Sequence, residues 1–73
     1  MKDTIEKGII PHLEGQISLH KANIEIYMKT PAGIGDHPCI MQAIEKELGE
    51  IARCQGLIDA WFSMKQPKHA PAI

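Results

Sequence analysis

The chain has 73 residues, with 8 Lys and Arg against 9 Asp and Glu. This length allows one small domain, whose core leaves a monomer marginally stable without a metal, a disulfide or a partner. The basic residues are scattered along the chain, so we expect no nucleic acid partner. No apolar run suits a membrane span or a signal peptide, so we expect a cytoplasmic protein without a membrane partner.

The first helix is predicted from about residue 4 to residue 29. Asp3 and Glu6 resemble the capping pair that begins many helices. Thr30 precedes a proline, which disfavours helical geometry in the residue before it and ends the helix. Pro11 lies too deep for the first turn, so we expect the helix either to kink there or to break.

A turn is predicted over residues 30–36, because this segment holds a proline and two glycines. The second helix is predicted over about residues 37–64, with Asp36 as its N-cap. Residues 65–73 contain two prolines and little apolar content, which indicates a flexible tail. No β alternation is present, so the sequence predicts an all-α fold in which residues 1–64 form an antiparallel helical hairpin.

Apolar residues at helical spacing form one main stripe on each predicted helix, and we expect these stripes to face each other. His20 falls within the first stripe, where we expect a neutral ring with a hydrogen-bond partner that fixes the register together with Gln55. The predicted hairpin core consists of Ile10, Leu13, Ile17, His20, Ile24, Met41, Ile44, Leu48, Ile51, Ile58, Trp61 and Phe62.

A second stripe lies on nearly the opposite side of the first predicted helix, where bulky and small residues alternate. A single partner helix covers only one of these two stripes. The small residues are either tolerated on a solvated face or let another helix approach closely, and we favour close packing in a four-helix bundle or a larger helical assembly. The predicted oligomer interface consists of Ile5, Gly8, His12, Gly15, Leu19, Ala22, Ile26, Gly49, Ala52 and Gly56.

Chemistry-bearing residues are few, and none has the spacing of a known type of site. Cys39 lies in the first turn of the second predicted helix, where the helix dipole lowers the pKa of a thiol. Asp36 opposes this effect, and no second cysteine follows at a redox spacing. Cys39, Cys54 and three histidines are possible metal ligands, but they lack the paired spacing of a zinc site; the histidines are His12, His20 and His37. We therefore predict no catalytic residue, metal or cofactor, and Cys39 is retained only as a candidate reactive thiol.

Residues 27–38 read Tyr-Met-Lys-Thr-Pro-Ala-Gly-Ile-Gly-Asp-His-Pro and lead into a predicted helix rich in Glu and Ala. This pattern resembles the linker of small uncharacterised two-helix proteins that are encoded by tailed bacteriophages and some bacteria. The resemblance covers the turn and the second helix, about half of the chain. It implies a hairpin and a phage or bacterial setting, and it supplies no catalytic residue.

Our first functional hypothesis is a non-enzymatic, self-associating helical hairpin that acts as a structural or protein-interaction module. The alternative is a small metal-binding or thiol-redox protein that uses Cys39 and nearby histidines. A third possibility is an adaptor that displays the second helix or residues 65–73 to a different, unidentified protein.

Overall fold

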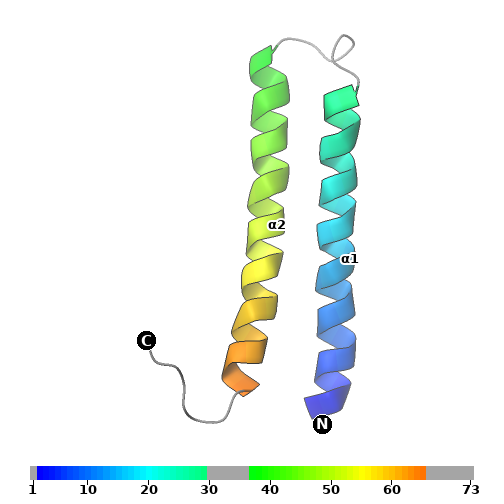
Figure 1. The fold of residues 1–73 in the computed structure, drawn as a ribbon, viewed down its shortest axis with the longest axis vertical. Helices are drawn as coiled ribbons and strands as arrows, with labels where there is room; N and C mark the ends of the chain where they lie inside the picture. Colours follow the sequence, from blue (N-terminus) through cyan, green and yellow to red (C-terminus); the bar gives the residue numbers. More distant parts are fainter. Residues whose placement is uncertain (1, 30–36, 66–73) are drawn as a thin grey trace.

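The computed structural model describes residues 2–29 and 37–65, which form two helices, α1 (Lys2–Lys29) and α2 (His37–Lys65). The two helices lie side by side and run in opposite directions (Figure 1). The prediction of an all-α hairpin is therefore confirmed for the described residues. The helices begin and end within two residues of the predicted bounds. The predicted turn at 30–36 lies outside the described residues, as does the predicted tail beyond Lys65.

α1 continues through Pro11 without a break. A proline inside a helix removes one backbone hydrogen bond and costs about 3 kcal/mol. Ile10 and Leu13 flank this position and are buried against α2, so tertiary packing holds the helix together on both sides of the proline. Of the two expectations for Pro11, the structure excludes a broken helix.

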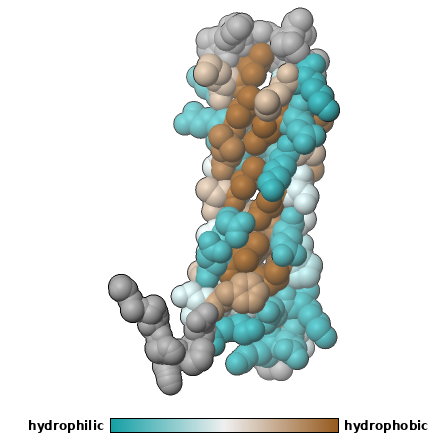
Figure 2. Space-filling view, viewed as in Figure 1, coloured by the Kyte–Doolittle hydropathy of each residue, from teal (hydrophilic) through white to brown (hydrophobic). Residues whose placement is uncertain are grey.

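The hydrophobic core is small and lies between the middle and the free end of the hairpin. Partly buried Ile51 and Trp61 pack against it. Figure 2 shows an apolar band along the line where the helices meet, flanked by hydrophilic side chains. The buried core residues are Ile10, Leu13, Ile17, Cys54 and Ile58.

Three residues predicted in the core are exposed instead: Met41 is 69% exposed, Leu48 54% and Phe62 40%. The reason is a rotation of α2 about its axis by about 50°, half the angle between consecutive residues, since Ile44, Ile51 and Ile58 remain on the side that faces α1. The residues of α2 that face α1 recur at alternating intervals of three and four. They include the residue that directly precedes each of the three exposed ones: Ile40, Glu47 and Trp61. This seam consists of Ile40, Ile44, Glu47, Ile51, Cys54, Ile58 and Trp61.

The seam of α1 has the same alternating spacing, and the remaining predicted core residues lie on it or on the seam of α2. His20 and Ile24 are partly buried, as are Ile44, Ile51 and Trp61. The α1 seam consists of Glu6, Ile10, Leu13, Ile17, His20, Ile24 and Tyr27.

The register of the hairpin is marked at its free end by an ion pair. Nζ of Lys65 donates to Oε1 of Glu6 over 2.9 Å. The same ammonium group lies 5.5 Å from the centre of the Phe62 ring, within the range of a cation–π contact. Further along the hairpin, the thiol of Cys54 donates to Oε1 of Gln16 over 3.5 Å, a second contact between the helices in the same register.

Truncation of a seam residue should destabilise the hairpin far more than truncation of an exposed one. We expect Leu13→Ala to lower the free energy of unfolding by about 2–5 kcal/mol, because it removes buried atoms and leaves a cavity. Met41→Ala is the matched control, since its exposed side chain should cost about 0.5 kcal/mol or less. Urea unfolding followed by circular dichroism measures both changes. Equal losses would contradict the rotation of α2 described above.

Candidate functional site

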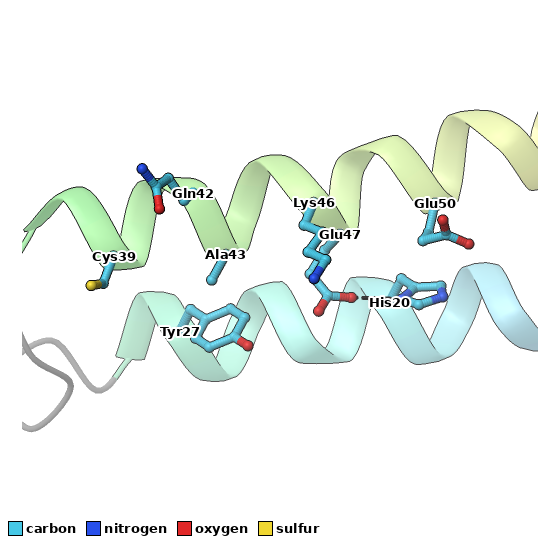
Figure 3. A pocket seen from close by; sticks show the side chains of 8 residues that line it. All are labelled: His20, Tyr27, Cys39, Gln42, Ala43, Lys46, Glu47 and Glu50. Carbon is cyan, nitrogen blue, oxygen red and sulfur yellow. Dashed lines mark hydrogen bonds and ion pairs between the residues drawn. The ribbon is translucent and has the colours of Figure 1, made fainter.

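A polar cluster interrupts the apolar seam near the middle of the molecule. Nδ1 of His20 donates to Oε1 of Glu47 over 2.6 Å, and Nδ2 of Asn23 donates to the same oxygen over 3.1 Å. The side chain of His20 is 18% exposed and that of Glu47 15%, so both are largely shielded from water. Figure 3 shows the dashed contact between the imidazole on α1 and the carboxylate on α2.

This cluster supplies the hydrogen-bond partner that the sequence predicted for His20, but the partner is Glu47 and not Gln55. Gln55 is exposed and donates to Asp59 of its own helix over 3.2 Å. A shift of α2 by one heptad would separate the imidazole from the carboxylate and leave both polar groups against apolar neighbours. The cluster therefore specifies the register of the two helices.

A hollow of about 490 Å³ lies beside the polar cluster, towards the end of the hairpin at which the two helices are connected. Cys39, the candidate reactive thiol, is exposed and lines this hollow from the first turn of α2. Lys46 and Glu50 line it from the same helix, and Tyr27 lines it from α1. The hollow thus gathers groups of both charges around an open surface.

His12 and Cys54, two further possible metal ligands, do not come together. His12 is exposed on α1, whereas Cys54 is fully buried and its thiol donates to Oε1 of Gln16 over 3.5 Å. No disulfide joins Cys39 to Cys54. Among the residues that the structure describes, no group of three or more His, Cys, Asp or Glu side chains is arranged to hold a metal ion.

The second stripe of α1 lies on the side of the helix that faces away from α2. Its bulky members are exposed, with Leu19 57% and Ile26 59% accessible. A Cβ atom added at Gly8 or Gly15 would meet nothing within 4 Å. We call this surface the outer strip; it consists of Ile5, Gly8, His12, Gly15, Leu19, Ala22 and Ile26.

The residues predicted for the interface on α2 are exposed as well. Gly49 and Gly56 have open space where a side chain would be, and Ala52 is exposed between them. The structure thus gives these three residues no packing role within the hairpin.

An apolar hollow of about 420 Å³ near the free end of the hairpin adjoins the outer strip and shares His12 with it. The indole ring of Trp61 forms part of this hollow, and its buried Nε1 has no hydrogen-bond partner among the described residues. The sequence did not lead us to predict this surface. The available signal was Leu57, an apolar residue that belongs neither to the predicted core nor to the predicted interface and is exposed in the structure. The hollow is lined by Ile9, His12, Leu13, Leu57, Ala60, Trp61 and Met64.

Neither helix has the character of a membrane span, since no segment within 2–29 or 37–65 combines the length and apolar content that crossing a bilayer requires.

The polar cluster makes the stability of the hairpin dependent on pH. The hydrogen bond from His20, followed by that from Asn23, lowers the pKa of Glu47 below its ordinary value of 4.5. A carboxyl whose pKa is lowered by folding stabilises the fold above that ordinary value and loses this effect as the pH falls through the folded pKa. We therefore expect unfolding to become easier below about pH 4.5.

Urea midpoints of wild type and Glu47→Gln, measured between pH 7 and pH 2.5, test this expectation. The midpoints should differ at pH 7 and converge in acid, while the exposed control Glu45→Gln should follow the wild type throughout. Glu6 adds a second acid-sensitive contact, because Lys65 lowers the pKa of its carboxyl. The variant should therefore retain part of the pH dependence. A constant difference between wild type and Glu47→Gln would contradict the assignment.

Comparison of the chain with models of protein families, with curated proteins and with solved structures finds no match. The resemblance of residues 27–38 to a phage linker therefore stays a prediction.

Proposed function

We propose that this protein is a non-enzymatic helical hairpin that self-associates through the outer strip of α1 and acts as a structural or protein-interaction module. The observation that carries this proposal is the pattern of the outer strip. Its residues recur at alternating intervals of three and four, as those of the buried seam do, but they lie on the opposite side of the helix. A helix with two such stripes is suited to a position between two neighbours.

The glycines of the outer strip support the same conclusion. A glycine inside a helix costs roughly 1 kcal/mol relative to alanine, and Gly8 and Gly15 gain no contact within the hairpin in return. Bare backbone at these positions lets a second helix approach closely, so that its bulky side chains fit against the strip. Packing of this kind would offset the intrinsic cost of both residues.

The size of the hairpin also favours association. Large apolar side chains remain exposed on both helices, including Leu19 on α1 and Leu57 on α2. The small buried core of the described residues leaves an isolated hairpin with little net stability. Association of two hairpins into a four-helix bundle would cover the outer strip of each copy. The resemblance of residues 27–38 favours a phage or bacterial accessory protein as the setting.

Charge placed on the outer strip should dissociate the oligomer. Sedimentation equilibrium at high micromolar concentration should give a multiple of the 8.1 kDa chain mass for the wild type and the single-chain mass for Leu19→Glu. Gly15→Glu should behave in the same way, because a buried carboxylate without a partner is costly.

Met28→Glu is the matched control, since it replaces an exposed apolar residue that lies outside the outer strip. Circular dichroism shows whether each variant remains helical. A wild-type mass of 8.1 kDa under these conditions would overturn the proposal.

A further inference from the structure

We propose that two copies of this chain pack their α1 helices antiparallel along the outer strip, related by a two-fold axis at the level of residue 17. This inference rests on the self-association proposed above and specifies its partner and orientation. In an isologous interface the same patch of both subunits meets itself, so the patch must be self-complementary. The order of bulky and small residues on the outer strip meets this condition in one orientation.

The bulky residues of the outer strip are seven residues apart, and the small ones lie between them at the same interval. If two strips ran parallel and in register, bulky side chains would meet bulky ones and glycine would meet glycine. This arrangement crowds some layers and leaves voids in others, and both are unfavourable. If the strips run antiparallel, three of the four bulky residues can lie opposite the three small ones.

One antiparallel register uses the whole outer strip. It places Leu19 over Gly15 of the second copy, Ile26 over Gly8 and His12 over Ala22, and the two-fold axis repeats each pair. At each end of this register, Ile5 meets the aliphatic stem of Lys29, whose ammonium group can still reach water. A shift by one heptad would carry Ile26 past the end of the partner's strip in one direction, and Ile5 and His12 past it in the other.

Charge does not oppose this arrangement. Between residues 8 and 24 of α1, the residues with a formal charge are Glu14 and Lys21, and both lie on a flank of the helix outside the outer strip. A second copy therefore brings no like charges together along this length. A partner with a strongly acidic or basic helix would find no complementary group on the strip, which favours a second copy as its occupant.

The extent of the outer strip also suits a second copy. From residue 5 to residue 26 it is about 32 Å long, and two helices of about 10 Å diameter in contact over this length present roughly 600 Å² of flat area. A stable interface needs about 1,000 Å² of total buried surface. The relief of interdigitated side chains raises the buried surface above this flat estimate, towards the size of a stable interface.

Disulfide exchange between two single-site variants tests the orientation. Both carry Cys39→Ser, while Cys54 is retained because it is fully buried. One variant then carries His12→Cys and the other Ala22→Cys, and the two are mixed in a glutathione redox buffer. We expect the disulfide between the two different variants to exceed either same-variant disulfide by at least about tenfold, as measured by peptide mass spectrometry of the dimer band.

A second pair, Gly8→Cys with Ile26→Cys, repeats the test in case one substitution prevents folding, and circular dichroism monitors helix content. Glu14→Cys mixed with Lys21→Cys is the matched control on the flank, and it should form no disulfide above the statistical level. Predominant same-variant disulfides would show a parallel dimer and overturn the inference. A dimeric mass without any disulfide from either pair would overturn it as well.

Sedimentation of the wild-type protein separates a failure of the proposed self-association from a failure of the proposed orientation. If sedimentation of the wild-type protein gives the mass of one chain, self-association itself is wrong, and the orientation has no meaning. If the wild type is oligomeric but the two test pairs do not cross-link as expected, self-association stands and the antiparallel packing of the outer strip is wrong.

Discussion

The hairpin depends on a single apolar seam, in which side chains of α1 and α2 interleave at alternating intervals of three and four residues. Leu13, Ile17 and Cys54 lie on this seam and are among the few described residues that the fold buries. These contacts hold α1 together through Pro11 and keep the two helices side by side. Because this contact fixes how the two helices are rotated, it also decides which side chains form the outer strip and the two hollows.

The polar cluster within the seam contributes specificity. Apolar layers resemble one another, so a seam made only of aliphatic residues would allow neighbouring registers of similar energy. The bond between His20 and Glu47, reinforced by Asn23, forms in one register alone. Desolvation of such a pair offsets much of its attraction, and its main effect is to penalise the alternatives.

α1 carries two stripes because both follow the same seven-residue period. Two repeats of equal period stay at a constant angle to each other along a helix, so the buried seam and the outer strip do not converge. The seam is built from large residues, whereas the outer strip alternates large residues with glycine and alanine. The first pattern fills the space within one hairpin, and the second suits close contact with another helix.

Local signals in the chain were sufficient to predict the two helices and their antiparallel pairing. The helical period of the apolar residues, and the end of the first helix at Thr30 before a proline, each depend on only a few neighbouring residues. Such signals also located the stripes of α1, where polar residues separate them clearly. The rotation of α2 emerged only from the packed hairpin, since apolar residues occupy two adjacent lines on that helix and the local pattern favoured Leu48 over Glu47 as the core position. The hydrogen bonds that His20 and Asn23 make across the hairpin reverse this choice, because they satisfy the carboxylate that burial would otherwise penalise.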